Sequence, residues 1–363
     1  MKTKSSINRR QAIALGAGAV SATLLGLPFA AHGATKRIGF AMETFTVPRW
    51  KNLDRPNFET AVRAGGYEPV VNQADFKVDQ QMADVENLVT RGVDCLAIVA
   101  VVAEAGINMA RRAKREGIPV IAYNTAIPSK DVDVYVSRDN RGVGRKVAGA
   151  AKTAGKLKGN WVIVSGQAGN TVAEEMTQGF MDVVQPEVAA GRVKIISQKF
   201  HDGWDPETAR RQAEAALTVT GNKIDGFLCN NDGMAGGVIA ALDQVGLAGK
   251  VFVSGMDASS DACRRIIEGK MALSSFTRFD EMGKVAGELA VRLAKGEKLG
   301  IKEQYDAGKG VLLPHVPIED FNVTRDNIVA YIKRYSPDYV DVAAVFKGIP
   351  KAQWPAGAEE LFK

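Results

Sequence analysis

From about residue 36 onward, short apolar runs alternate with segments whose apolar residues recur at helical spacing. Runs at 36–42, 67–72, 93–102 and 119–123 are typical of buried strands. The segments 55–64 and 79–91, and a third that stops at Gly117, have the spacing of helices, and each is followed by a glycine stop signal. This alternation predicts βαβ units built on a parallel sheet.

The same alternation restarts in the second half of the chain. Apolar runs at 160–165, 193–197, 224–228 and 251–254 predict strands. The segments 173–184, 206–219 and 236–244 predict the helices between them. The fold class is therefore α/β, with two successive lobes, each built on a doubly wound parallel sheet.

The two halves repeat one another weakly. In the first half a strand follows Asp94 and the next strand ends at Asn124. In the second half the corresponding positions are Asp225 and Asp257, at nearly the same spacing. Ligands of open parallel sheets bind at the carboxyl ends of the strands, so polar residues just past those ends are the first candidates for a site.

Several amides, carboxylates and aromatic residues stand after predicted strands or in adjoining loops. The set is Arg49, Trp50, Asn124, Thr125, Asp139, Asn140, Asn170, Trp204, Asn231 and Asp257. Each hydroxyl of a neutral polyhydroxylated ligand both donates and accepts, so amides and carboxylates can pair with it. Trp50, Trp204 and Phe276 offer faces for the apolar side of a sugar ring. The competing interpretation is that each Asn or Asp is a helix cap or a turn former, as we expect for Asp232. Asn231 and Asp257 favour the ligand interpretation because they recur at corresponding places in the two halves.

The net charge of +6 overstates how basic the folded part is. The segment 1–34 contains Lys2, Lys4, Arg9 and Arg10 and no acid, so the rest of the chain carries +2 (+6 minus 4). A balance so close to zero gives no reason to expect a nucleic-acid partner.

The segment 1–34 is predicted to be a cleaved export signal. A basic start leads to Arg9 and Arg10, then to an apolar stretch rich in Gly and Ala, and small residues near Ala34 suit cleavage. The arginine pair and the apolar residue after it resemble a twin-arginine signal, which predicts a periplasmic location. The alternative is a membrane anchor, although the stretch is barely long enough to span a bilayer.

The sequence does not favour an enzyme, a metal site or a cofactor site. The chain has three histidines, without zinc-ligand spacing and without an HExxH motif. No Gly-x-Ser-x-Gly motif occurs, and the loop 166–169 lacks the lysine of a P-loop. Cys95, Cys229 and Cys263 are expected to be buried free thiols, because three is an odd number and two of them lie in apolar runs.

The chain from about residue 36 to about residue 328 resembles the type I periplasmic sugar-binding proteins of ABC importers, the ribose/xylose-binding family. The resemblance rests on Pro48-Arg49-Trp50-Lys51, Arg91-Gly92-Val93-Asp94, the run 117–123, Ser137-Arg138-Asp139-Asn140, Asp202-Gly203-Trp204-Asp205-Pro206-Glu207, Asn231-Asp232 with Ala235-Gly236-Gly237, and Ser254-Gly255 with Asp257-Ala258. It implies two lobes joined by three crossing segments, with the ligand in the cleft between them. The implied lobes are 35–138 with about 273–310, and 139–272 with about 311–335, followed by a tail at 336–363.

The resemblance also implies ligand contacts at Arg49, Asn124, Thr125, Asp139 or Asn140, Asn170, Trp204, Asn231, Asp257 and Thr277. Two places depart from the xylose-binding members. Asn124-Thr125 replaces Asp-Arg, and Thr277 replaces Lys. Fewer charge-assisted hydrogen bonds should therefore reach the ligand. The hypothesis is that the ligand is another pentose, a polyol or a related small carbohydrate rather than D-xylose.

The predicted activity is binding without chemistry. Lobe closure around the ligand would create the surface that a membrane permease recognises, and the protein is expected to be a monomer. Presentation of the ligand to a chemoreceptor or sensor, or binding of a solute that is not a sugar, stays open as an alternative. A sugar-responsive transcription regulator is disfavoured, because an export signal occupies the place of its DNA-binding helix-turn-helix.

Overall fold

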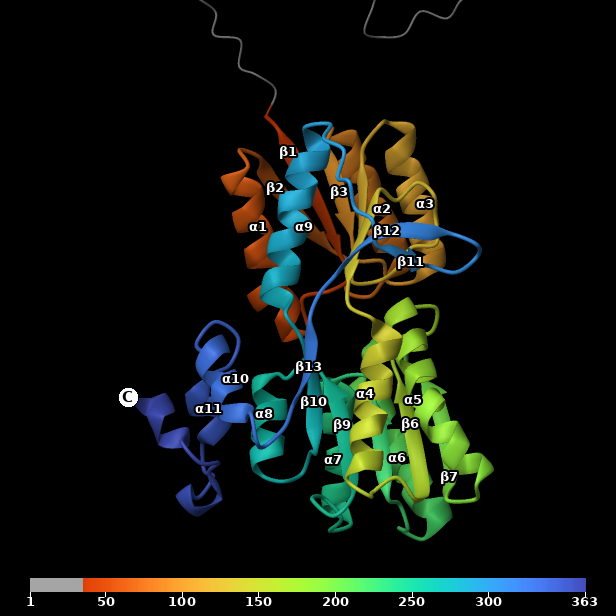
Figure 1. Ribbon diagram of the computed structural model, residues 1–363, viewed down its shortest axis with the longest axis vertical. Helices are drawn as coiled ribbons and strands as arrows, with labels where there is room; N and C mark the ends of the chain where they lie inside the picture. The colour runs from red at the N-terminus through yellow and green to blue at the C-terminus, as the bar shows by residue number, and fades with distance from the viewer. Residues whose placement is uncertain (1–34) are drawn as a thin grey trace, which may run out of the picture. The chain divides into compact units, whose positions relative to one another are not determined.

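The computed structural model describes residues 35–363 (Figure 1). The predicted export signal and its cleavage site near Ala34 lie outside the described residues. Residues 36–363 form one unit, and that unit contains two α/β lobes, each with its own sheet. The predicted fold class is confirmed.

The N-terminal lobe is built on a seven-stranded sheet in the order β11-β12-β5-β4-β3-β1-β2. Its strands are β1 (Arg37–Met42), β2 (Glu68–Gln73), β3 (Cys95–Ile98), β4 (Val120–Tyr123), β5 (Val134–Ser137), β11 (Gln304–Asp306) and β12 (Leu312–Pro317). The central strands β3, β4 and β5 are buried at every position, as parallel strands covered on both faces must be. Only β11 is antiparallel to its neighbour.

Four α-helices and a short π-helix cover this sheet. They are the π-helix η1 (Trp50–Asp54), α1 (Arg55–Ala64), α2 (Val78–Thr90), α3 (Ala103–Arg115) and α9 (Phe279–Ala294). Buried residues of α1 and α9 pack with one face of the sheet, and those of α2 and α3 pack with the other.

The C-terminal lobe is built on a six-stranded sheet in the order β13-β10-β9-β8-β6-β7. Its strands are β6 (Gly159–Ser165), β7 (Val193–Phe200), β8 (Gly226–Cys229), β9 (Phe252–Met256), β10 (Leu273–Thr277) and β13 (Asp320–Val323). Its helices are α4 (Asn140–Thr153), α5 (Thr171–Ala189), the 3₁₀ turn η2 (Asp202–Trp204), α6 (Pro206–Thr220), α7 (Asp232–Gln244), α8 (Ser260–Ile267) and α10 (Ile328–Tyr335). The helices α4 and α5 pack together, and so do α6 and α7.

The internal repeat expected from the sequence is present in the sheets. The Asp94 carboxylate accepts a hydrogen bond from the backbone N–H of Arg37 at the start of β1, at 2.8 Å. The Asp225 carboxylate accepts one from the backbone N–H of Asn160 in β6, at 2.7 Å. The strands β1, β3, β4 and β5 therefore correspond to β6, β8, β9 and β10.

Three segments connect the lobes, and two expected boundaries need correction. The chain crosses between β5 and α4, between β10 and α9, and between β12 and β13. The ranges expected from the sequence place β10 in the N-terminal lobe and β12 in the C-terminal lobe. Instead β10 pairs with β9 and β12 pairs with β5. A short apolar run carries no signal of which sheet it joins, because that choice depends on long-range pairing.

The tail 336–363 folds against the C-terminal lobe. It forms the helix α11 (Val342–Phe346) and the 3₁₀ turns η3 (Lys351–Gln353) and η4 (Ala358–Phe362), and α11 packs on α8. Its buried side chains include Tyr339, Val340 and Phe346. The tail therefore belongs to the core of this lobe.

The three cysteines are buried free thiols, as predicted. Within residues 35–363, none of the helices combines the length and the apolar character needed to span a bilayer.

Candidate ligand-binding site between the lobes

A pocket lined by residues of both lobes lies between them. Its lining is Glu43, Val47, Arg49, Trp50, Phe76, Asn124 and Arg138 from the N-terminal side and Val172, Trp204, Asn231, Met256 and Asp257 from the C-terminal side. Glu43, Asn124, Arg138 and Asp257 directly follow the carboxyl ends of β1, β4, β5 and β9. Parallel strands bring these four ends to one edge of each sheet, which is where ligands of this fold class bind.

Hydrogen bonds and aromatic contacts fix the position of the Arg49 guanidinium. Its Nε and Nη2 donate to the two carboxylate oxygens of Asp54 at 3.0 and 2.6 Å. The ring centroids of Trp50 and Phe279 lie 3.8 and 3.4 Å from its Cζ, so the planar group is sandwiched between two aromatic faces. Tyr123 donates its hydroxyl to Asp54 at 2.6 Å and fixes the carboxylate in turn. Arg49 therefore presents a rigid positive edge to the pocket.

The side chain of Asn124 is oriented by two guanidinium groups. Its Oδ1 accepts from Nη1 of Arg49 at 3.2 Å and from Nη1 of Arg138. This arrangement leaves its Nδ2, a donor, as the other polar end of the side chain. The backbone of Asn124 has a φ of 63°, which Asn adopts more readily than most residues. An aspartate at this position would offer only acceptor oxygens, so the departure noted in the sequence exchanges an acceptor for a donor.

Arg138 lies in the first crossing segment and contacts both lobes. Its Nη1 donates to Asn124 in the N-terminal lobe, and its Nη2 lies 3.2 Å from the Met256 sulfur in the C-terminal lobe. The side chain is fully buried, and its Nε has no hydrogen-bond partner. Within residues 35–363 no carboxylate forms an ion pair with it at 4.0 Å or less. Burial and the neighbouring Arg49 lower the pKa of Arg138.

Burial favours the protonated form of two carboxyl groups that line the pocket. Burial raises the pKa of Glu43 to about 8, against the opposing effect of Arg49. Burial likewise raises the pKa of Asp257 to about 7, although Arg49 and Arg138 oppose that rise. Hydrogen bonds from ligand hydroxyls to their oxygens would stabilise the ionised form of both groups.

Trp204 forms an aromatic wall on the C-terminal side. A Cβ at Gly166 would lie 2.4 Å from the Trp204 ring, so the indole occupies space that only a glycine leaves free. This contact gives Gly166 a packing role. The Trp204 Nε1 is buried and has no hydrogen-bond partner, which makes it a donor available to a ligand.

Four buried polar atoms that lack partners belong to side chains that line the pocket. They are Glu43 Oε2, Arg138 Nε, Trp204 Nε1 and Asp257 Oδ1. Buried polar groups in folded proteins are nearly always hydrogen-bonded, so such a cluster indicates a place where a ligand supplies the missing partners. Two of the four atoms belong to donor groups and two to carboxyl groups, which matches the dual character of hydroxyl groups.

The structure brings six of the eleven predicted site residues to the pocket. They are Arg49, Trp50, Asn124, Trp204, Asn231 and Asp257. Asn231 also caps α7, because its Oδ1 accepts from the backbone N–H of Met234 at 2.9 Å. The capping and ligand interpretations therefore both apply to this residue.

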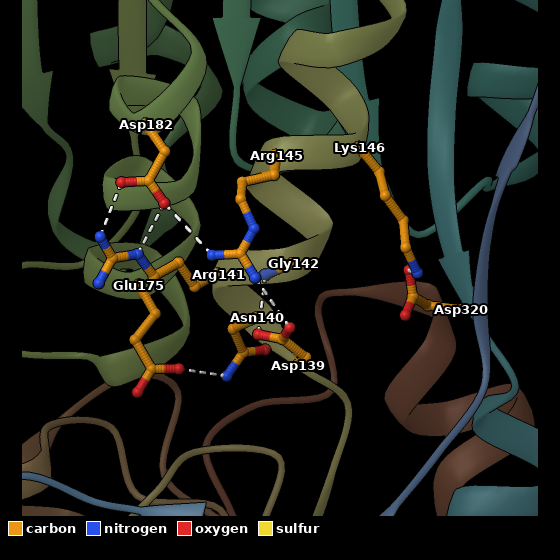
Figure 2. A network of polar contacts seen from close by, with 9 residues as sticks. All are labelled: Asp139, Asn140, Arg141, Gly142, Arg145, Lys146, Glu175, Asp182 and Asp320. Atoms are coloured by element: carbon orange, nitrogen blue, oxygen red, sulfur yellow. Dashed lines mark hydrogen bonds and ion pairs between the residues drawn. The ribbon is translucent and has the colours of Figure 1, made fainter. Parts of the chain in front are cut away.

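Asp139 and Asn140 lie elsewhere (Figure 2). Asp139 caps α4 by accepting from the backbone N–H of Gly142 at 2.8 Å and pairs with Arg145 on the exposed surface. The Asn140 amide donates to Glu175 at 2.9 Å. Both side chains are absent from the pocket lining, because Asp139 caps the first turn of α4 and Asn140 bonds to Glu175 of α5.

Asn170 and Thr125 belong to a direct contact between the lobes. The Asn170 Nδ2 donates to the carbonyl of Val101 at 3.1 Å and lies 3.5 Å from the Thr125 hydroxyl. Its Oδ1 caps α5 by accepting from the backbone N–H of Val172 at 3.0 Å. Neither Asn170 nor Thr125 is part of the pocket lining, so the ligand contacts implied at both positions stay a prediction.

Thr277 and Phe276 are also outside the pocket lining. Thr277 is buried at the end of β10. Phe276 is surrounded by Phe279, Phe321 and tyrosines of α10 and the tail, so it is a core residue rather than a sugar platform.

Sequence reasoning missed four polar or large lining residues, namely Glu43, Phe76, Arg138 and Met256. Glu43 was detectable, because it follows the first predicted strand by the same rule that selected Asn124. Arg138 directly precedes the predicted pair Asp139-Asn140. No pattern distinguished Phe76, which has a positive φ of 60° in a loop.

A second, larger cavity adjoins the pocket. It shares Val47, Phe76, Trp204, Asn231 and Asp257 with the pocket. Residues from both lobes and from the tail, including Pro337 and Tyr339, complete its lining. The pocket therefore opens toward a wider groove that the tail borders. No group of three or more His, Cys, Asp or Glu side chains within 35–363 is arranged to hold a metal ion.

Comparison with known proteins places this architecture in a family. The D-xylose-binding periplasmic protein of Escherichia coli is 35% identical over 276 residues, which cover 76% of this chain and 83% of that protein. A xylitol-binding protein of Mycolicibacterium smegmatis is 26% identical over 339 residues. That match covers 90% of this chain and 92% of the other protein.

Among solved structures, a carbohydrate transporter solute-binding protein from Chloroflexus aurantiacus in complex with D-glucose has a TM-score of 0.76 and 26% identity. That match covers 87% of this chain and 100% of the other. The family described as periplasmic binding protein domain matches residues 38–298. The chain belongs to this family of periplasmic binding proteins.

Proposed function

We propose that the protein is a periplasmic solute-binding protein that captures one small carbohydrate, a pentose, a polyol or a related sugar, in the cleft between its lobes. It delivers this ligand to the membrane permease of an ABC importer. The single observation that carries the proposal is the cluster of partnerless buried atoms on Glu43, Arg138, Trp204 and Asp257, whose side chains line the pocket between the lobes.

The chemistry of the pocket supports a polyhydroxylated ligand. Carboxyl groups accept from hydroxyls, while the indole N–H and the guanidinium donate to them. Aromatic side chains, Trp50, Phe76 and Trp204, line the same space and can cover the apolar face of a ring.

The relatives support the same class of ligand and the same transport role. Their names describe binding of D-xylose and xylitol, and the solved neighbours include an ABC transporter solute-binding protein with bound β-D-glucose at 27% identity. The mechanism follows from the architecture. The ligand bridges the lobes and stabilises the closed form, because it contacts residues of both only when they meet.

The N-terminal segment supports the location. A twin-arginine type signal, cleaved near Ala34, would deliver the folded chain to the periplasm, where we propose that it acts as a monomer. Purified protein with a processed N-terminus would be the expected product of export.

A thermal-shift screen tests the proposal. The purified protein is heated with a panel of pentoses, hexoses, polyols and sugar acids, each in large excess. A ligand at a hundred times its Kd should stabilise the folded protein by roughly 2.7 kcal/mol, which gives a clear rise in Tm. A rise confined to one or a few neutral sugars or polyols supports the proposal. A flat panel with folded, ligand-free protein would contradict it, and a response to acids alone would move the ligand class to anionic sugars.

A further inference from the structure

The backbone directly after β9 is held in an unusual conformation. Asp257 and Ala258 have φ values of 105° and 50°. Residues other than glycine rarely adopt positive φ, and two in succession persist only where the surroundings hold them. Asp257 carries one of the partnerless atoms of the pocket, so whatever holds this pair also positions a group of the site.

Two tyrosine hydroxyls hold the carbonyls of this pair. Tyr339 donates to the carbonyl of Asp257 at 2.9 Å, and Tyr331 donates to that of Ala258 at 2.8 Å. Tyr339 lies in the segment 336–341, which follows α10 and is outside the residues 38–298 that match the family. Both rings are buried in the aromatic cluster around Phe276.

In the N-terminal lobe, a tyrosine of the adjacent strand holds the corresponding carbonyl. Asn124 follows β4 with a positive φ, and its carbonyl accepts from the Tyr135 hydroxyl at 2.9 Å. The backbone N–H of Asn124 donates to Val136, and that of Asp257 donates to Ser275. Tyr135 in β5 therefore corresponds to Ser274 in β10.

Ser274 does not take over the role of the tyrosine. Its hydroxyl donates to Asp232 at 2.6 Å and accepts from the backbone N–H of Ala258 at 2.9 Å. The carbonyl of Asp257 receives its tyrosine hydroxyl from the C-terminal segment, 82 residues away in the chain.

We propose that Tyr339, and through it the segment 336–341, is a positioning element of the ligand site that fixes the Asp257 carboxyl group in its binding geometry. The proposal rests on the proposed function. Tyr339 donates to the backbone of Asp257 and borders the wider groove, but it is not part of the lining of the smaller pocket. Its removal therefore acts on the placement of a ligand-contacting group, and precise placement determines how well polar groups bind.

The test compares two tyrosine variants in the full-length protein. Tyr339→Phe removes the hydroxyl that bonds to Asp257 and keeps the ring. Tyr335→Phe is the matched control, because Tyr335 packs in the same cluster, 4.7 Å from the Phe276 ring, while its hydroxyl reaches only Asp280 at 3.5 Å. Ligand affinity is measured by calorimetry at 25 °C with D-xylose, D-ribose and xylitol. Hydrogen exchange of the peptide that spans Asp257 and Ala258 is measured without ligand.

We expect Tyr339→Phe to weaken the tightest of these ligands roughly tenfold and to speed exchange at Asp257 and Ala258, while Tyr335→Phe changes neither. An unchanged Kd and unchanged exchange would overturn the proposal. A lower Tm with unchanged Kd would also overturn it, because the hydroxyl would then serve stability alone. If the wild-type protein binds none of the three ligands, the proposed function is in question, and the exchange measurement still decides the positioning role.

Discussion

The ends of β4 and β9 form a natural comparison, because each places one polar residue of positive φ at the cleft. On the N-terminal side this residue is Asn124, whose oxygen is occupied by two guanidinium groups and whose free end is a donor. On the C-terminal side it is Asp257, a carboxyl group with an oxygen that has no partner. The repeated framework thus fixes two equivalent positions, and the side chains at them give the two strand ends opposite hydrogen-bonding character.

The ends of β4 and β9 also differ in how their backbone carbonyls are held. The Asn124 carbonyl accepts from Tyr135 and Ser137 of the adjacent strand. The Asp257 carbonyl depends on Tyr339, far along the chain. One half of the site is therefore self-contained, whereas the other half requires the C-terminal segment.

The largest effect is expected from the side chain that joins the two ends. Arg138 donates to Asn124 and contacts Met256, the residue before Asp257. Arg138→Met removes its donors and leaves an amide oxygen short of a partner. Hydrogen bonds to charged groups contribute about 1.5–3 kcal/mol, so we expect affinity to fall by roughly a hundredfold, measured by calorimetry.

The control for this variant is Arg145→Met. Arg145 is an exposed arginine that pairs with Asp139 and Asp182 on α4 and α5 (Figure 2). Its loss should leave the Kd unchanged, since exposed ion pairs contribute little. Binding by Arg138→Met within threefold of wild type would contradict the bridging role.

Two substitutions, Asp257→Asn and Asn124→Asp, test whether the polar residues at the two strand ends have different roles in binding. Asp257→Asn keeps the size of the side chain and replaces one acceptor oxygen by a donor. We expect every ligand of the protein to bind about tenfold more weakly, because a charge-assisted hydrogen bond is lost. Asn124→Asp should instead change the ranking of D-xylose against xylitol, because it replaces a donor by an acceptor beside Arg49 and Arg138.

Calorimetric titration of both ligands with both variants checks this expectation. Equal weakening of all ligands by both variants would mean that the two ends are interchangeable. Folding is monitored by Tm, and Asp139→Asn serves as an exposed control outside the pocket.

The sequence predicted the framework of the site better than its contents. Strand ends can be located from apolar runs and glycine stops, which is why Arg49, Asn124, Asn231 and Asp257 were found. Whether a polar residue faces the cleft or caps a helix depends on a shift of a single position along the chain. Arg138 and Asp139 are adjacent, yet one is fully buried and the other is exposed. The partnership of Tyr339 with Asp257 was not predictable, because contacts across 82 residues leave no local pattern.

Ligand affinity should also depend on pH. Burial raises the pKa of Glu43 to about 8 and that of Asp257 to about 7, above their ordinary values of 4.5 and 3.8. A raised carboxyl pKa means that the folded protein loses stability as pH rises from the ordinary value through the raised one. Ligand hydroxyls that donate to these oxygens favour the ionised forms, so binding releases protons.

We therefore expect affinity to rise several-fold between about pH 6 and pH 8, with an upper limit of roughly tenfold per pH unit for each proton released. Arg49 opposes the rise in the pKa of Glu43, whereas Asp54 and Asp257 add to it. Calorimetry in buffers of different ionisation enthalpy counts the protons. Asp257→Asn should reduce the number released, and an affinity that does not change over this range would contradict the shifted pKa values.

The smallest expected effect concerns two helix caps that differ in one respect. Asn170 caps α5 and Asp139 caps α4 with similar geometry, at 3.0 and 2.8 Å. Only Asn170 also donates to the opposite lobe, at the Val101 carbonyl. Either change to alanine should reduce the free energy of unfolding by about 1 kcal/mol through loss of the cap. Asn170→Ala should in addition weaken ligand binding by roughly three- to fivefold, because it removes a contact that exists only when the lobes meet. Asp139→Ala should leave the Kd unchanged, and equal Kd values for the two variants would show that this contact does not favour closure.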